Sequence, residues 1–232
     1  NLTDIAALVK ESGADVGFVV DPDVDRLAIV QDGGEMFGEE YTLVAIADYV
    51  LAHTPGSTVS NLSSSRALRD VTEAHGCTYT AAAVGEVNVT TEMKRTGAVI
   101  GGEGNGGVIY PELHYGRDAL VGVALFLTLM AKTGRKPSEI RAMMPEYCIY
   151  KTKVQLQPGL NVDKLLVQIK EKYADEKITD IDGVKIDFAD SWVHLRKSNT
   201  EPIVRVYSEA QTPEKAEALA NSVKDVILAM ID

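Results

Sequence analysis

The sequence predicts a mixed α/β protein in three parts: the end of one mixed-sheet α/β domain, a complete α/β domain, and a C-terminal α+β domain with an antiparallel sheet. We place these parts at residues 1–34, 35–136 and 137–232. Up to residue 136, short apolar runs alternate with stretches of helical periodicity, which is typical of a largely parallel sheet. Beyond it, strand-like runs follow one another around an Asp-Gly turn, which is typical of antiparallel hairpins.

The first part is predicted to consist of a helix, a strand, an acidic loop and a second strand. Apolar residues at helical spacing predict the helix over residues 2–11. Two apolar runs, 16–20 and 27–30, predict strands on either side of the acidic loop. The chain does not begin with Met and opens directly on this helix, so we expect the N-terminal domains of the same protein to lie upstream.

The other two parts follow from the same reasoning. In the middle part, helices are predicted at residues 41–53, 65–75, 87–95 and 117–132, and strands at 58–62, 78–84 and 98–101. In the last part, helices are predicted at 137–144 and 162–173, and strands at 147–156, 177–181, 184–188, 192–196 and 203–209. A final helix begins with Thr212 as N-cap and Pro213 in the first helical position.

Composition excludes several classes of function. The chain has 232 residues, 45% of them apolar, and a formal net charge of -11, which argues against nucleic acid or an anionic membrane as partner. No apolar run is long enough to span a bilayer. Cys77 and Cys148 lie far apart without metal-site spacing, which suits a reducing compartment. We therefore expect a cytoplasmic protein.

The most informative motif is the acidic loop, Asp21-Pro22-Asp23-Val24-Asp25-Arg26. Three carboxylates at alternate positions repel one another unless a cation lies between them, and oxygen ligands suit Mg²⁺ or Ca²⁺. An EF-hand calcium loop also begins this way, but it requires Gly at the sixth position, where this chain has Arg26. A solvated acidic turn is the remaining alternative. Arg26 favours a metal site with a second anion, such as phosphate, nearby.

A second motif is the glycine-rich segment 101–107, which reads Gly-Gly-Glu-Gly-Asn-Gly-Gly and which we predict to be a loop between two strands, 98–100 and 108–110. It matches neither a dinucleotide fingerprint nor a nucleotide P-loop. Glu103 and Asn105 offer acceptors and donors that suit the hydroxyl groups of a sugar. The alternative is a glycine-rich hairpin without a ligand.

A third motif is cationic and joins two predicted strands: Arg196-Lys197-Ser198-Asn199-Thr200-Glu201-Pro202, followed by Arg205. Arginine can bind phosphate through two parallel hydrogen bonds, and successive N–H groups in a turn form an anion-binding nest. The alternative is a charged hairpin tip.

In this order, the three motifs resemble the α-D-phosphohexomutase superfamily, which includes phosphoglucosamine mutase, phosphomannomutase and phosphoglucomutase. The resemblance implies an isomerase that moves a phosphoryl group between the 1- and 6-positions of a hexose phosphate through a phosphoserine and a bisphosphate intermediate. It implies that Asp21, Asp23 and Asp25 hold Mg²⁺ and that Arg26 lies beside the reacting phosphate. It also implies sugar contacts from Glu103 and Asn105. The residues implied to anchor the other phosphate are Arg196, Ser198, Asn199, Thr200 and Arg205.

Two departures from the family pattern matter. The phosphoserine loop is absent, so we expect this chain alone to be inactive; Ser63-Ser64-Ser65 better fits a strand-to-helix turn with an N-cap. Asn105 and Gly107 stand where many members have Ser and His, a form that resembles phosphoglucosamine mutases more than the phosphomannomutase or phosphoglucomutase alternatives.

Other readings stay open at this point. The chain could be a non-catalytic phosphosugar-binding module, or a metal-dependent phosphatase with Asp21 as its nucleophile. Lys94, His114 and Arg117 could face the site, although surface ion pairs or a helix cap would also explain them.

Overall fold

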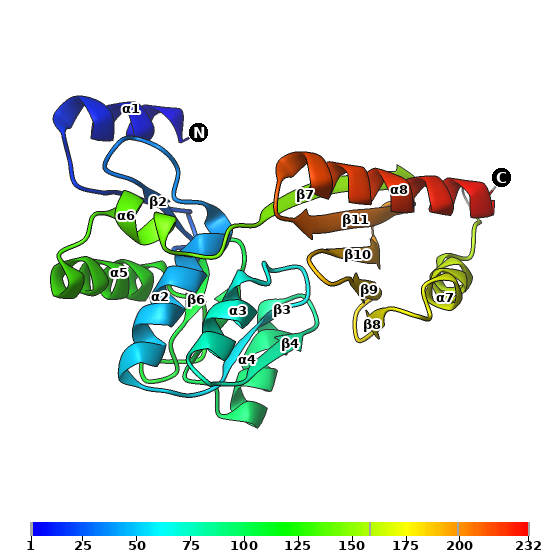
Figure 1. The fold of residues 1–232 in the computed structure, drawn as a ribbon, viewed down its shortest axis with the longest axis horizontal. Coiled ribbons are helices and arrows are strands. Elements are labelled where there is room, and N and C mark those ends of the chain that lie inside the picture. Colours follow the sequence, from blue (N-terminus) through cyan, green and yellow to red (C-terminus); the bar gives the residue numbers. More distant parts are fainter. Residues whose placement is uncertain (1, 158, 199, 232) are drawn as a thin grey trace. The chain divides into compact units, whose positions relative to one another are not determined.

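The computed structural model describes residues 2–157, 159–198 and 200–231. The chain divides into two compact units, Asn1–Pro145 and Glu146–Asp232 (Figure 1). We expected the last part to begin at residue 137, but the helix there contacts the first unit. Ser138 donates hydrogen bonds to Asp32 from its N–H (3.0 Å) and from its hydroxyl (3.1 Å). The Arg141 guanidinium also stacks on the Tyr41 ring, 3.4 Å from its centroid.

The first unit opens with the predicted helix and strand pair. Helix α1 (Thr3–Ser12) precedes strands β1 (Gly17–Val20) and β2 (Leu27–Val30), which pair in antiparallel fashion with Val20 opposite Leu27. The acidic loop therefore closes a β-hairpin. Phe18 of β1 packs edge-on against Phe126, at 6.2 Å between ring centroids, so the hairpin is anchored on a helix about a hundred residues later in the chain.

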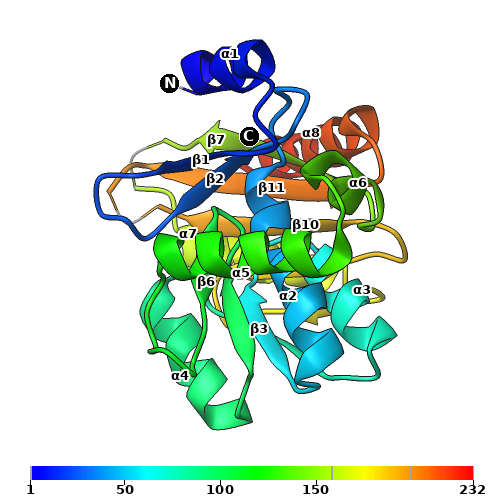
Figure 2. The ribbon, with the colours of Figure 1, turned by 90° about the vertical axis from the view of Figure 1, so that its left-hand side faces the viewer.

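The rest of the first unit is built around a four-stranded sheet, which is largely parallel as predicted (Figure 2). Its strands are β3 (Thr58–Asn61), β4 (Tyr79–Ala82), β5 (Ile100–Glu103) and β6 (Gly107–Ile109), in the order β4-β3-β5-β6. Strand β3 is parallel to β4 and β5, whereas β5 and β6 are antiparallel. The helices are α2 (Glu39–His53), α3 (Ala67–Ala74), α4 (Glu86–Thr96), α5 (Ala119–Thr133) and α6 (Pro137–Ala142).

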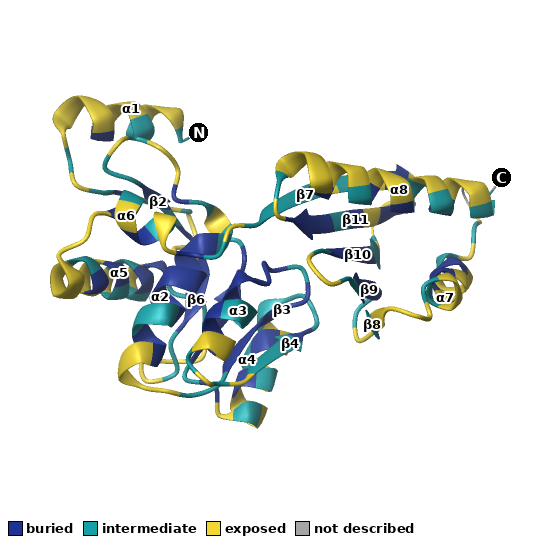
Figure 3. Ribbon diagram, in the orientation of Figure 1, coloured by how far each residue is buried: buried dark blue, intermediate teal, exposed yellow. Residues whose placement is uncertain are grey.

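Helix α2 is the central helix of this unit and is dark along most of its length in Figure 3. It packs against β2, β5, β6, α3 and α5. Helix α4 packs against β3, β4 and β5, so β5 contacts both helices. Helices α2 and α5 both contact β2 and β6, so they connect the hairpin of the acidic loop with the four-stranded sheet.

The second unit is the predicted antiparallel α+β domain. Its five-stranded sheet has the order β7-β11-β10-β9-β8, and every adjacent pair is antiparallel. Its elements are β7 (Cys148–Gln155), α7 (Val162–Lys172), β8 (Lys177–Thr179), β9 (Val184–Asp187), β10 (Trp192–Lys197), β11 (Ile203–Ala210) and α8 (Pro213–Ile231). Apolar residues of α7 and α8, such as Ile169 and Ile227, form one core with Val193 and Val206 of the sheet. In the part of the chain that is described, no helix meets the length and apolarity needed to cross a membrane.

Candidate functional site

The acidic loop is a tight turn that is organised around Asp21. Its Oδ1 accepts hydrogen bonds from the backbone N–H groups of Asp25 (3.1 Å) and Arg26 (3.2 Å). Between them, Val24 adopts a φ of 57°, a left-handed conformation that β-branched residues rarely take. Strain of this kind persists only where the surroundings enforce it, and it is common at functional sites.

The carboxyl groups of Asp21 and Asp25 lie close together at the base of this turn. Burial and a hydrogen bond with Asp21 raise the pKa of Asp25. Burial also acts to raise the pKa of Asp21, but hydrogen bonds from the Arg26 N–H and from Asp25 outweigh it and lower that pKa. The Arg26 guanidinium lies 3.9 Å from both carboxylates. Two carboxyl groups that meet in this way need either a shared proton or a cation between them.

The donor chemistry of the loop therefore fits a hard divalent cation. Asp23 is exposed, and it is not among the groups that shift the pKa values of the other two acids. Within residues 2–157, 159–198 and 200–231, no three His, Cys, Asp or Glu side chains are grouped closely enough to hold a metal ion. The loop thus has the kinds of side chain that bind a metal, but its three carboxylates are not already arranged around one point.

The glycine-rich segment is mostly strand, and this differs from the long loop that we expected. Gly101, Gly102 and Glu103 belong to β5, and Gly107 opens β6, so that only residues 104–106 form the turn. The backbone explains the glycines. A Cβ on Gly102 would lie 2.0 Å from the Gly107 carbonyl oxygen, and one on Gly106 would lie 2.4 Å from the Leu27 carbonyl oxygen.

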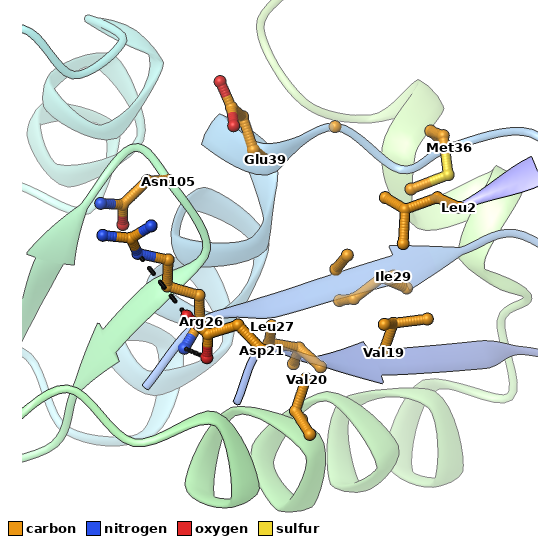
Figure 4. A pocket seen from close by; sticks show the side chains of 12 residues that line it. Leu2, Val19, Val20, Asp21, Arg26, Leu27, Ile29, Met36, Glu39 and Asn105 are labelled. Carbon is orange, nitrogen blue, oxygen red and sulfur yellow. Dashed lines mark hydrogen bonds and ion pairs between the residues drawn. The ribbon is translucent and has the colours of Figure 1, made fainter. Parts of the chain in front are cut away.

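The glycine turn packs directly on the acidic hairpin. The Leu27 N–H, at the start of β2, donates a hydrogen bond of 3.0 Å to the Gly106 carbonyl. Asn105 and the acidic loop line one cavity of about 420 Å³. Figure 4 shows Asp21, Arg26 and Asn105 at one end of it. Apolar side chains, among them Leu2 and Met36, line the other end.

Glu103 is 4% exposed, and both of its carboxylate oxygens accept hydrogen bonds. Oε1 accepts from the side-chain amide of Asn61 (2.8 Å) and from the Gly85 N–H (3.2 Å). Oε2 accepts from Nη1 of Arg117. A carboxylate has about four acceptor positions, and these three hydrogen bonds use three of them.

Arg117 connects the acidic loop with the glycine turn. Its Nη2 forms an ion pair with Asp25, its Nη1 pairs with Glu103, and its Nε lies 3.5 Å from Glu86 at the start of α4. The side chain is only 13% exposed, so solvent screens these pairs weakly. For Arg117 the sequence leaves open a side chain that faces the site, a surface ion pair or a helix cap. The signal that could have raised its rank is its position just before Asp118, which caps the long helix α5.

The two other weak candidates have simpler surroundings. His114 pairs with Asp118 at 3.0 Å, and the Lys94 ammonium lies 4.9 Å from the centre of the Tyr115 ring.

The predicted turn at Ser63-Ser64-Ser65 is present, and the Ser65 hydroxyl accepts a hydrogen bond from the Ala67 N–H at 3.1 Å. The Ser64 hydroxyl accepts a hydrogen bond of 2.9 Å from the Gly104 N–H, which gives the glycine turn a second support.

In the second unit, the cationic turn joins β10 to β11. The Ser198 N–H donates to the Ile203 carbonyl (3.0 Å), and the Ser198 hydroxyl accepts from the N–H groups of Thr200 and Glu201, both at 3.3 Å. Asn199 lies outside the described residues. This turn is short and polar, with backbone N–H groups directed toward its interior.

The two arginines of this motif are directly opposite each other on adjacent strands, Arg196 on β10 and Arg205 on β11. Arg196 lines a cavity of about 330 Å³ beside α7 and the β8–β9 turn. Arg205 is exposed and lines a hollow of about 350 Å³ with Lys151, Lys153 and Tyr207. The structure thus places both arginines side by side on two inner strands of the sheet, and each lines a different hollow.

Comparison with known proteins agrees with the fold and the motifs. The family model for domain III of phosphoglucomutase/phosphomannomutase matches residues 38–147, and the model for the C-terminal domain matches residues 153–226. A phosphoglucomutase/phosphomannomutase of Thermococcus kodakarensis is 35% identical over 217 residues, which are 93% of this chain and 48% of that protein. A phosphoglucosamine/phosphogalactosamine mutase of Sulfurisphaera tokodaii is 32% identical over 98% of this chain and 51% of its own length.

A solved structure gives the same answer. The crystal structure of a phosphoglucomutase/phosphomannomutase family protein from Burkholderia thailandensis superposes with a TM-score of 0.85 at 26% identity, and covers 99% of this chain and 50% of that one. The chain spans about half the length of the curated relatives it matches. Two domain models that together match most of the sequence, and relatives aligned along nearly all of it, show that the chain belongs to the phosphoglucomutase/phosphomannomutase family.

Proposed function

We propose that this chain is part of a phosphohexomutase, an isomerase that moves a phosphoryl group between the 1- and 6-positions of a hexose phosphate, and that glucosamine phosphate is its preferred substrate. The observation that carries the proposal is the contact between the acidic loop and the glycine turn. The Leu27–Gly106 hydrogen bond and the Arg117 guanidinium hold them side by side, so one phosphosugar could meet carboxylates, a guanidinium and an amide together.

In this proposal residues 1–34 close a preceding domain, a complete domain begins at residue 35, and the last domain begins with the second unit, at residue 146 rather than at 137. The catalytic serine and the N-terminal domains belong to the remainder of the protein, in line with relatives about twice as long as this chain. We therefore infer that the chain alone does not turn over hexose phosphates.

Each motif has a separate role in phosphoryl transfer, which depends mostly on positioning and on neutralising charge. Asp21, Asp23 and Asp25 would hold Mg²⁺, which supplies Lewis-acid stabilisation of phosphoryl oxygens when it is bound. Arg26 would lie beside the reacting phosphate, since its exposed guanidinium is directed into the cavity of Figure 4. Asn105 would bind a sugar hydroxyl from the same cavity, and Glu103 would accept one through its remaining acceptor position.

The phosphate that does not react would bind to the cationic turn. Arg196 and Arg205 supply guanidinium groups, and the turn supplies short polar side chains that can donate hydrogen bonds. The residues proposed for this anchor are Arg196, Ser198, Asn199, Thr200 and Arg205.

Titration calorimetry on the 232-residue chain in Mg²⁺ tests this function. We expect glucosamine 6-phosphate to bind more tightly than mannose 6-phosphate or glucose 6-phosphate, and unphosphorylated glucosamine not to bind measurably. Asn105→Ala should weaken all three sugar phosphates and spare inorganic phosphate, whereas Arg196→Gln should weaken inorganic phosphate too. Equal binding of glucosamine with and without its phosphate would overturn the proposal.

A further inference from the structure

The turn between β8 and β9 presses against β10 next to the cationic motif. Gly183, with a φ of 70°, makes this approach possible, because a Cβ there would lie 2.1 Å from the Leu195 carbonyl oxygen and 3.1 Å from Cγ of Arg196. His194 directly precedes Leu195 on β10, and its Nε2 is 2.7 Å from the Asp182 carbonyl oxygen. A carbonyl can only accept, so Nε2 donates this hydrogen bond.

The same turn places an acid against Arg196. Oδ2 of Asp182 lies 2.9 Å from Nε of Arg196, and this contact is an ion pair without a hydrogen bond aligned on the Nε–H. The contact with Asp182 is made at Nε, the guanidinium nitrogen nearest the backbone. The two terminal N–H₂ groups of Arg196 are therefore the part of the side chain that we expect a ligand to meet.

Three ion pairs surround the cavity that Arg196 lines, and they differ in exposure. The Arg196 and Asp182 side chains are 27% and 24% exposed. The corresponding values are 39% and 56% for Lys170 and Asp180, and 48% and 73% for Lys197 and Asp163. Exposed pairs are screened by solvent and hold their side chains weakly. The Arg196–Asp182 pair is consequently the one best able to fix a guanidinium in this cavity.

We propose that Asp182 is a positioning residue that holds the Arg196 guanidinium ready for a phosphate group. The two outer N–H₂ groups of a fixed guanidinium can meet two phosphate oxygens in parallel, which is the strongest arrangement for this pair. Without Asp182, binding would also have to order a long, flexible side chain, at a cost to affinity. This inference rests on the proposed function, because it assigns Arg196 to the phosphate anchor.

The test uses the 232-residue chain and two probes, inorganic phosphate and glucosamine 6-phosphate. We expect Asp182→Asn to weaken binding of both probes about 3- to 10-fold, as expected for the loss of one pre-ordered side chain. Asp180→Asn is the matched control, since it removes the acid of the exposed Lys170 pair on the same cavity. It should change neither affinity by more than about 2-fold. Asp182→Glu, which keeps the charge, should recover part of the loss.

A second measurement needs no variant. We expect ¹⁵N relaxation of the arginine Nε–H groups to show Arg196 rigid before any ligand is added, and the exposed Arg205 more mobile. Equal mobility of the two, or an Asp182→Asn variant that binds like Asp180→Asn, would overturn the positioning role. If Arg196→Gln itself leaves phosphate binding unchanged, the proposed anchor fails instead, so the two failures can be told apart.

Discussion

Arg117 is a single guanidinium that neutralises acids from three separate segments of the first unit, Asp25, Glu86 and Glu103. Glu103 has no other cationic partner among the described contacts and is almost completely buried. Removing one member of a buried ion pair leaves a charge without compensation, which costs more than the intact pair contributes. We therefore expect Arg117→Gln to destabilise the first unit by about 3 kcal/mol.

Urea denaturation followed by circular dichroism measures this effect, with Arg95→Gln as control. Arg95 forms a similarly close pair with Glu92 on the outside of α4, but its side chain is 67% exposed. The control should change the free energy of unfolding by at most about 0.5 kcal/mol. Arg117→Lys should fall between the two, since it keeps the charge without the planar fork. Equal effects of Arg117→Gln and Arg95→Gln would contradict a buried, connecting role.

The roles of individual residues could be predicted from the sequence only where the residues of a motif are consecutive or nearly so. The acidic loop and the cationic turn each place their groups within a few consecutive positions, so their chemistry could be inferred before any fold was known. Arg117 could not be assigned in this way, because its partners lie about 90, 30 and 15 positions away and meet only through packing. The carboxylate of Glu103 also accepts hydrogen bonds from Asn61 and Gly85, and no local sequence pattern connects these residues with it.

At the scale of elements, helix α5 depends on its N-cap, Asp118. The carboxylate accepts hydrogen bonds from the N–H groups of Leu120 (2.8 Å) and Val121 (3.1 Å) and contacts His114. Since α5 also carries Phe126, which packs on the acidic hairpin, the cap supports the site. We expect Asp118→Ala to lower the free energy of unfolding by about 1 kcal/mol.

The same residue predicts a dependence on pH. Burial acts to raise the pKa of Asp118, but hydrogen bonds from His114, Val121 and Leu120 outweigh it and lower that pKa below its ordinary value of 3.8. The carboxylate therefore contributes its full stabilisation above pH 3.8, and the contribution disappears as the pH falls toward the lowered pKa. Thermal unfolding from pH 7 to pH 3 should show the difference between wild type and Asp118→Ala shrinking in acid. Asp118→Asn, which can still cap, should lose less at pH 7, and a difference independent of pH would contradict the assignment.

Elements with clear periodicity were predicted from sequence to within a few residues, for example α5 and the hairpin strands β1 and β2. The glycine-rich segment was not, because glycine disfavours strands in general. Here β5 and β6 extend into the segment. Glycine is required there because the Gly102 and Gly107 backbones lie close together and the Leu27 backbone lies close to Gly106, so that a larger residue would clash. The steric reason is tertiary and cannot be seen in a single sequence.

At the scale of the whole molecule, the second unit holds a core of its own. Strand β7, which opens the unit, pairs with β11 along its length, and α7 and α8 cover the sheet from the same core. Cutting the chain between Pro145 and Glu146 would therefore remove no strand or helix of this unit. We expect residues 146–232 to fold when they are produced alone, since domains of this size commonly carry a sufficient core.

Trp192 provides the measurement, because it is the only tryptophan of the chain and its Nε1 donates a hydrogen bond of 2.6 Å to Glu209 within the second unit. In the isolated unit we expect native secondary structure by circular dichroism, and a single cooperative urea transition that coincides when it is followed by tryptophan fluorescence. Leu195→Ala, in the buried core of β10, is a positive control and should lower the unfolding free energy by about 2 to 5 kcal/mol. A fully solvent-exposed tryptophan spectrum in buffer, or a gradual transition insensitive to Leu195→Ala, would show that this part of the fold depends on the rest of the protein. A folded unit would in turn let the phosphate anchor be studied apart from the acidic loop, because all of its proposed residues lie between Arg196 and Arg205.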